Sequence, residues 1–189
     1  MAEGEAPGGS RDAAHQERLE RLDRAFSEFI PHNRALGLRF LDHGPGEAVM
    51  RLPYREDLVG DPSSGVLHGG AITALLDATS GAAVFLAMAE PVPIATLDLR
   101  IDYLRPATPG RAVIARATCY RLTGNVAFVR AQAYHEDAEA TPIAASAGSF
   151  MIGTRGAWAF RRPKPGSPEE SAAASSPEDA AASSPEETP

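Results

Sequence analysis

One carboxylate stands alone in a long apolar segment of this 189-residue chain. Asp77 is the only charged residue between Gly70 and Ala89, where almost every other side chain is small or hydrophobic. Burying a carboxylate is costly unless its surroundings offset the desolvation, so Asp77 is a candidate general base or nucleophile. The alternative is a structural carboxylate that caps a neighbouring segment.

His68, Gly69 and Gly70 stand directly before this segment. The first N–H groups of a helix have no intrahelical partners, and glycine lets a ligand approach the backbone closely. A helix N-terminus also favours developing negative charge. The Gly69 N–H is therefore a candidate oxyanion donor, with Gly70 beside it in the binding turn; the alternative is a plain tight turn. His68 could orient a substrate or the adjoining loop, or be a buried histidine bonded to the backbone.

The spacing of Gly69 and Asp77 carries a further expectation. Eight helical steps separate them, roughly 12 Å along a helix axis. One carbonyl group cannot contact both at hydrogen-bond range. If both act on the same carbonyl, they come from different subunits, which predicts a homo-oligomer with sites at its interface.

The elements that hold these residues follow from periodicity. An amphipathic helix that ends at Pro31 is predicted from apolar residues at helical spacing. Two extended segments, about 36–41 and 47–52, flank a turn at 43–46. After residue 90 the pattern favours strands, the last three of them an antiparallel meander joined in part by the Thr123-Gly124-Asn125 hairpin. The apolar helix positions are Leu19, Leu22, Phe26, Phe29 and Ile30, and the strands span 94–104, 111–122, 126–135 and 141–153.

The apolar segment 70–89 is predicted to be a single helix that is buried on every side, because it has no polar face. A membrane span is the alternative, since the length is sufficient. Asp77 near its centre and the lack of basic flanking residues argue against a membrane span. The sequence thus predicts an α+β fold in which an antiparallel sheet wraps around one long buried helix.

The run Gly65-Val66-Leu67-His68-Gly69-Gly70, followed by Asp77 and by the segment TLDLRIDYLRPATPG at 96–110, resembles the hotdog-fold thioesterases. Within them it is most similar to the branch named for the phenylacetic-acid-degradation thioesterase. This resemblance implies a hotdog fold and an acyl-coenzyme A thioesterase that works as a dimer, often paired into tetramers. It implies no cofactor.

The resemblance also suggests roles for further residues. Thr96 matches a polar residue that follows the helix and could hold the attacking water. Asp61 stands seven residues before His68, where many relatives have an asparagine six residues before; a plain loop acid is the other reading. The family runs coenzyme A along the surface beside strand ends and turns. The expected contacts there are Arg105, Arg121, Gly124 and Asn125, because arginine suits phosphates.

Composition excludes several other classes of protein. Residues 164–189 hold one lysine and six carboxylates, leaving only −2 of the formal charge of −7 for the rest. A body without a basic face does not suit a nucleic-acid-binding protein. The single cysteine, Cys119, cannot form an internal disulfide, and the N-terminus lacks a secretory pattern, so a cytoplasmic location is expected. The histidines at 15, 32, 43, 68 and 135 show no metal-ligand spacing.

Two other functions compete with hydrolysis. A hotdog dehydratase or hydratase would need an aspartate–histidine pair on an overhanging segment, and the sequence has no such signature. A non-catalytic acyl-CoA-binding module could use the same groove, although such a module has no reason to keep a buried carboxylate at Asp77.

The chain ends differ from the single domain expected over residues 17–160. Disorder is predicted for residues 1–16 and for the 161–189 tail, because neither can bury enough apolar surface. Residues 164–189 contain no Val, Ile, Leu, Met, Phe, Trp or Tyr. Deleting 164–189 should therefore leave the melting temperature and turnover unchanged. A fall of several degrees in a thermal scan of the truncated protein would contradict this prediction.

Overall fold

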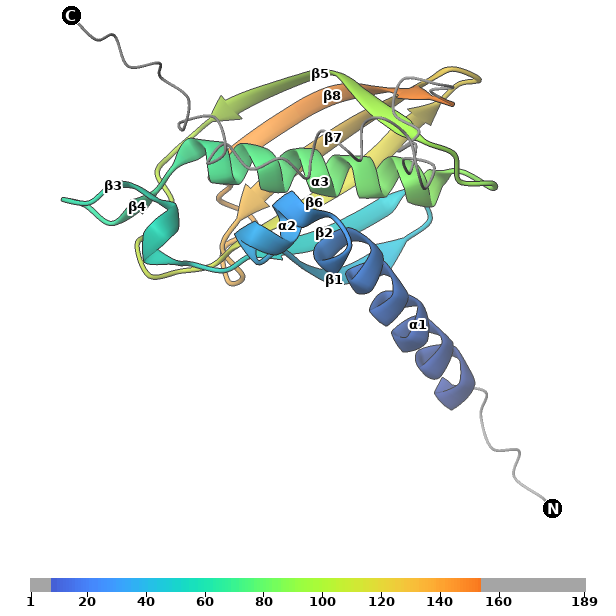
Figure 1. Cartoon of the computed structure of the whole chain (residues 1–189), viewed down its shortest axis with the longest axis horizontal. Helices are drawn as coiled ribbons and strands as arrows, with labels where there is room; N and C mark the ends of the chain where they lie inside the picture. Colours follow the sequence, from blue (N-terminus) through green and yellow to red (C-terminus); the bar gives the residue numbers. More distant parts are fainter. Residues whose placement is uncertain (1–7, 154–189) are drawn as a thin grey trace, which may run out of the picture. The chain divides into compact units, whose positions relative to one another are not determined.

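A six-stranded antiparallel sheet curves around one long helix in the computed structural model, which describes residues 8–153 (Figure 1). The helix is α3, Gly69–Ala87, within two residues of the predicted 70–89. The strands lie in the order β1-β2-β6-β7-β8-β5, with each neighbouring pair antiparallel. The predicted α+β class and hotdog arrangement are confirmed.

The predicted meander is the core of this sheet. Its strands β6, β7 and β8 follow one another in space as in sequence, and Thr123 N–H closes the first hairpin on the Val126 carbonyl at 2.9 Å. Strand β5 forms the edge beside β8, and the β1–β2 hairpin extends the opposite side. The strand bounds are β1 Arg39–Gly44, β2 Glu47–Leu52, β5 Ile94–Tyr103, β6 Val113–Leu122, β7 Val126–Tyr134 and β8 Ala144–Ile152; a separate ribbon pairs β3 Val59–Asp61 with β4 Val66–Leu67, after a 3₁₀ turn Glu56–Leu58.

The N-terminal helix is longer than predicted. Helix α1 spans Gly8–Asp23, so the disorder expected for residues 1–16 is wrong for residues 8–16. Contacts distant in sequence help to hold it: the His15 ring stacks on His43 with centroids 4.3 Å apart, and His15 Nε2 lies 3.2 Å from Asp42 Oδ1. Burial, and then His15, lower the pKa of His43, which favours the neutral ring in this stack. Residues 1–7 and 154–189, including the predicted tail and the end of the predicted domain, lie outside the described residues.

A π-helical turn, Arg24–Glu28, follows α1 and changes which side chains face inward. Phe29 N–H donates to the Arg24 carbonyl, five residues back, at 2.9 Å. Phe26, inside the turn, packs against the core, whereas the wider turn rotates the residues that follow it and leaves Phe29 84% exposed. The prediction that Phe29 shares the apolar face is therefore wrong.

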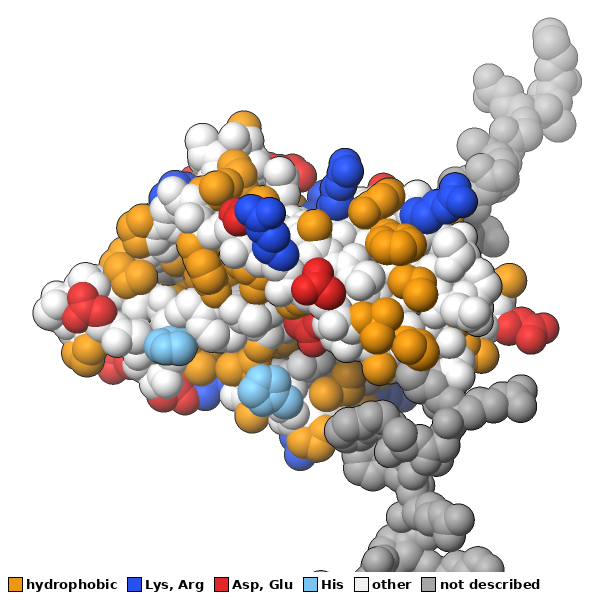
Figure 2. Space-filling view, turned by 90° about the horizontal axis from the view of Figure 1, so that it is seen from above, with side chains coloured by type: hydrophobic (Ala, Val, Ile, Leu, Met, Phe, Trp, Pro, Cys, Tyr) orange, Lys and Arg blue, Asp and Glu red, His pale blue; other side chains and the backbone are white. Residues whose placement is uncertain are grey.

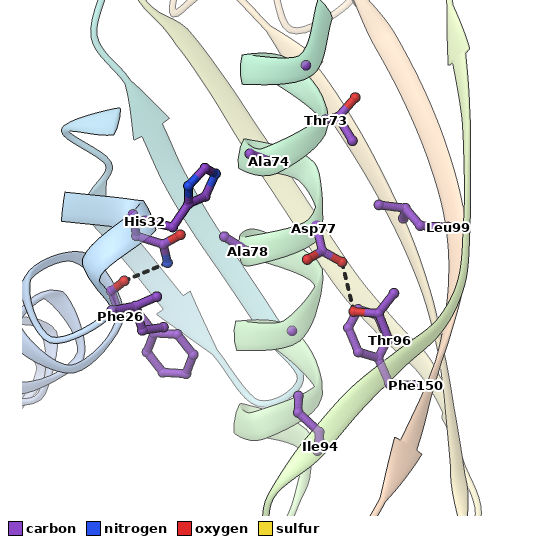
Figure 3. Close-up of a pocket in the computed structure, with 14 residues that line it drawn as sticks. Phe26, His32, Thr73, Ala74, Asp77, Ala78, Ile94, Thr96, Leu99 and Phe150 are labelled. Atoms are coloured by element: carbon purple, nitrogen blue, oxygen red, sulfur yellow. Dashed lines mark hydrogen bonds between the residues drawn. The ribbon is translucent and has the colours of Figure 1, made fainter. Parts of the chain in front are cut away.

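The segment after this turn contains a short helix that was not predicted, and the extended segment expected at about 36–41 starts later than expected. Helix α2, Pro31–Leu36, begins at a proline and ends at Gly37, whose φ of 72° suits glycine. Strand β1 therefore begins only at Arg39. The short helix places His32 near the middle of α3 (Figure 3), and Asn33 lines the same cavity as the middle of α3.

Helix α3 is buried on all sides but one. It packs against β2, β6 and β7, with Leu75, Leu76 and Val84 fully buried. By length and composition α3 could cross a membrane, but this packing makes it the core helix of the sheet. One stripe stays only half-buried, so the prediction of burial on every side is wrong there; the stripe comprises Thr73, Ala74, Asp77, Ala78 and Gly81.

Candidate active site

The half-buried stripe of α3 forms the floor of an open, largely apolar cavity of about 460 Å³. Its walls come from the π-helical turn, α2, β5 and β8, and Figure 3 shows Phe26 and His32 on one side of α3 and Thr96, Leu99 and Phe150 on the other. The lining residues are Phe26, Ile30, His32, Asn33, Gly70, Thr73, Ala74, Asp77, Ala78, Gly81, Ile94, Thr96, Leu99 and Phe150.

Asp77 and Thr96 meet in this cavity. Thr96 Oγ1 donates a hydrogen bond to Asp77 Oδ1 at 2.9 Å (Figure 3). Thr96 stands where the β5–β8 register shifts between Thr96 and Asp98. Within residues 8–153, Asp77 forms no ion pair and receives its only side-chain hydrogen bond from Thr96. The second carboxylate oxygen is therefore available to a molecule in the cavity.

His68 is the N-cap of α3. Its Nδ1 accepts a hydrogen bond from Gly70 N–H at 2.9 Å, which requires the tautomer protonated on Nε2. The alternative reading of His68, a histidine bonded to the backbone, is correct in its bonding but wrong in its burial, because His68 is exposed. Gly70 lines the cavity of Asp77, but its N–H is already engaged.

Gly69 lies on a different cavity, of about 380 Å³, near the β5 end at Tyr103. Its N–H donates to no group among residues 8–153. Arg105 lines the same cavity, where its guanidinium donates to the Thr141 carbonyl at 2.6 and 3.2 Å. Gly69 and Asp77 thus share one helix yet face separate cavities, in agreement with the distance expectation.

Asp61 is occupied by its own loop. Its carboxylate accepts hydrogen bonds from Ser64 Oγ at 2.6 Å and from Ser63 Oγ at 2.7 Å. These bonds, that of Ser64 first, lower the pKa of Asp61 below its ordinary value. Asp61 lines neither cavity described above, which favours the reading as a loop acid.

The expected coenzyme A contacts fall at two ends of the sheet. Arg105 lies beside Gly69, whereas Arg121, Gly124 and Asn125 lie at the end that carries Ile94. Asn125 fixes this end, because its carbonyl accepts the Ile152 N–H at 2.8 Å and Ile152 pairs with Ile94. None of the three hairpin residues lines the cavity of Asp77.

Several cavity residues escaped prediction from the sequence. His32 and Asn33 come from α2, a helix that was not predicted, and Phe150 comes from β8. Tyr103 was placed only among the apolar positions of the predicted strand 94–104. Its hydroxyl was the one feature in the sequence that could have indicated a polar contact. In the part of the chain that the structure describes, no three His, Cys, Asp or Glu side chains are grouped to hold a metal ion.

The surface seen from the β5 side carries hydrophobic side chains toward both ends, with charged groups near its middle (Figure 2). Leu97 and Tyr103 of β5 are each about half exposed, at 51% and 52%. On its outer edge β5 pairs with no described strand. An edge strand with exposed apolar side chains is typical of a surface that another chain covers.

Comparison with known proteins gives consistent relatives. The model of the thioesterase superfamily matches residues 64–141. The chain is 28% identical over 151 residues to the medium/long-chain acyl-CoA thioesterase YigI of Escherichia coli, covering 73% of this chain and 96% of that protein.

Two solved structures are similar in both sequence and fold. A Pseudomonas aeruginosa protein is 44% identical, with 70% of this chain and 97% of that chain covered and a TM-score of 0.63. A variant of the phenylacetic acid degradation protein PaaI from Thermus thermophilus is 33% identical, with 65% and 98% covered and a TM-score of 0.57.

Proposed function

Because this chain belongs to the thioesterase superfamily and is a thioester hydrolase, we propose that it hydrolyses acyl-coenzyme A at a site shared between two subunits. One subunit supplies Asp77 with Thr96, and its partner supplies the Gly69 N–H. The observation that carries this proposal is the Asp77–Thr96 pair on the floor of an apolar cavity, with a free N–H at the N-terminus of the same helix.

The chemistry follows from the two oxygens of Asp77. Thr96 holds Oδ1, so Oδ2 either removes a proton from water as the water attacks the thioester carbon or attacks that carbon itself. The carbonyl oxygen becomes negative and accepts the Gly69 N–H of the second subunit. The C–S bond then breaks, coenzyme A leaves as the thiolate and takes up a proton, and the acyl group leaves as a carboxylic acid, directly or after hydrolysis of an acyl-aspartate.

The direction of β5 supports the shared site. Tyr103, at the C-terminal end of β5, donates to the Gly69 carbonyl at 2.7 Å, and Thr96, near the other end, contacts Asp77. If two copies pair their free β5 edges antiparallel about a two-fold axis near residues 99–100, Thr96 of one copy faces Tyr103 of the other. Such pairing brings Asp77 of one subunit toward Gly69 of its partner and covers the exposed side chains of β5.

The lining of the cavity indicates the class of acyl group. Apart from Asp77, Thr96 and a few other polar groups, its walls are aliphatic or aromatic. A cavity of about 460 Å³ with such walls favours hydrophobic acyl chains or rings over the acetyl group, because burial of apolar surface contributes to binding. The medium/long-chain preference in the name of YigI is consistent with this class.

Turnover of a panel of acyl-CoA esters tests the proposal. Release of free thiol from acetyl-CoA, medium-chain, long-chain and aromatic acyl-CoA esters should show hydrolysis of the hydrophobic esters, with kcat/KM at least about tenfold above that for acetyl-CoA; two buried methylene groups are already sufficient for a tenfold difference. Binding measured by calorimetry with no thiol release from any ester would instead identify a non-catalytic acyl-CoA-binding module.

A further inference from the structure

Two hydroxyl groups close on the carbonyl of Gly69 at the start of α3. Tyr103 Oη donates to this carbonyl at 2.7 Å, and Thr73 Oγ1 lies 3.1 Å from it and 2.7 Å from Tyr103 Oη. Each hydroxyl carries one hydrogen, so at most two of the three contacts are hydrogen bonds at any moment. Tyr103 comes from β5, 34 residues along the chain, and thus ties the edge strand to the first turn of α3.

The same peptide group is held from its other side. Gly70 N–H donates to His68 Nδ1 at 2.9 Å, so both the oxygen and the N–H of the Gly69–Gly70 peptide are engaged. The preceding peptide is also fixed, because the His68 carbonyl accepts Ala71 N–H at 3.0 Å. The Gly69 N–H belongs to this preceding peptide, which is joined to the restrained Gly69–Gly70 peptide at the Gly69 Cα, and the N–H itself is unpartnered within residues 8–153.

The two glycines leave the space for these contacts. A Cβ at residue 69 would lie 3.1 Å from Tyr103 Oη, and a Cβ at residue 70 would lie 2.9 Å from His68 Nδ1. Both distances are shorter than ordinary van der Waals contact. The glycine pair therefore lets Tyr103 and His68 approach the backbone from two directions.

We propose that Tyr103, together with Thr73, is a positioning residue that fixes the direction of the Gly69 N–H. This inference rests on the proposed function, in which that N–H receives the oxyanion. A donor stabilises a transition state most when it is already aimed at the place where charge develops. Without the Tyr103 hydroxyl, the first turn of α3 keeps its helical bonds but loses the tie that sets its orientation relative to β5.

The variant Tyr103→Phe tests this role. It keeps the ring on the cavity wall and removes only the hydroxyl, so we expect kcat to fall about ten- to a hundredfold while KM stays within about twofold, because a displaced donor weakens the transition state more than ground-state binding. Thr73→Val should lower kcat less, and Thr73→Ser, which retains the hydroxyl, should restore it. The double variant should lose less than the product of the two single losses, because the hydroxyls act as one cluster.

Tyr54→Phe is the matched control. Tyr54 Oη also donates to a backbone carbonyl, that of Gly65, at 3.0 Å, in the loop that precedes α3. We expect a change in melting temperature similar to that of Tyr103→Phe but an unchanged kcat. Equal losses of kcat in both variants would indicate general loosening and overturn the positioning role.

Other outcomes separate this inference from the function on which it rests. Retention of kcat in Tyr103→Phe, or a rise in KM alone, would overturn the positioning role. If Gly69→Pro is inactive while Tyr103→Phe is fully active, only the positioning role fails. If Gly69→Pro and Asp77→Asn are both fully active, the proposed site fails and the positioning role fails with it.

Discussion

Replacing Asp77 by asparagine should lower kcat for acyl-CoA hydrolysis by about 10²–10⁴-fold, the usual scale for losing general acid–base assistance. The amide retains an oxygen that can accept the Thr96 hydroxyl, which in the native protein donates to Asp77 at 2.9 Å. A neutral amide also costs less to bury than a carboxylate, so the variant should fold. Steady-state thiol release and a thermal scan measure the two effects.

Glu136→Gln is the control for this substitution. Glu136 is an exposed carboxylate just after β7, away from the β5 edge, and it does not line the cavity. The same change of charge should leave turnover there within about twofold, because screened surface charges contribute little. Near-normal turnover of Asp77→Asn would remove Asp77 from the reaction and favour the binding-module reading.

Mixing two inactive variants should restore activity if the site is shared. Gly69→Pro removes the donor N–H and should lower kcat by about 10²–10³-fold, as loss of an oxyanion donor does. Proline is tolerated at the first helical position, and His68 already has the extended conformation that suits a residue before proline. The added Cβ would lie 3.1 Å from Tyr103 Oη, so the Tyr103 side chain has to shift slightly to accommodate it. When the Gly69→Pro protein is mixed with the Asp77→Asn protein and the subunits exchange, each heterodimer has one intact site and one site that lacks both groups.

The expected recovery is about a quarter of wild-type activity, since random exchange of equal amounts makes half the dimers heterodimers with one good site of two. Each variant incubated alone is the control, and differently tagged subunits report the exchange itself. Proven exchange between two folded variants with no return of activity would mean that Asp77 and Gly69 of different subunits do not act on one carbonyl.

Local patterns in the sequence were sufficient for most of the fold. The β6–β7 hairpin, the β6–β7–β8 meander and α3 were all predicted from alternation, turn residues and an unbroken apolar run, because each depends on neighbours in the chain. The N-terminal part of α1 was missed because it is held partly by the contact of His15 with His43, and no local pattern encodes a contact between residues 28 positions apart.

Some features of the site could not be predicted from the sequence for the same reason, because they depend on contacts between residues distant in the chain. The His68-Gly69-Gly70 run followed by Asp77 indicated both site residues. The eight helical steps between Gly69 and Asp77 indicated that they lie too far apart to contact one carbonyl. The sequence could not indicate that Tyr103 reaches the Gly69 carbonyl, because that contact depends on how β5 lies along α3. Nor could an apolar helix pattern distinguish a face packed on the sheet from a face that opens on a cavity, since both require the same residue types.

The π-helical turn at Arg24–Glu28 allows the side chains that line the cavity wall to change without a change in the sheet or in α3. A π-helical turn contains one residue more than a regular α-helical turn, so it is equivalent to a one-residue insertion within the helix. Gaining or losing that residue would exchange Phe26 for a neighbouring side chain on the wall, while α3, β5 and the Asp77–Thr96 pair stay in place. Acyl-group preference could thus diverge among descendants of this protein through the length of its N-terminal helix, independently of the residues proposed to carry out the reaction.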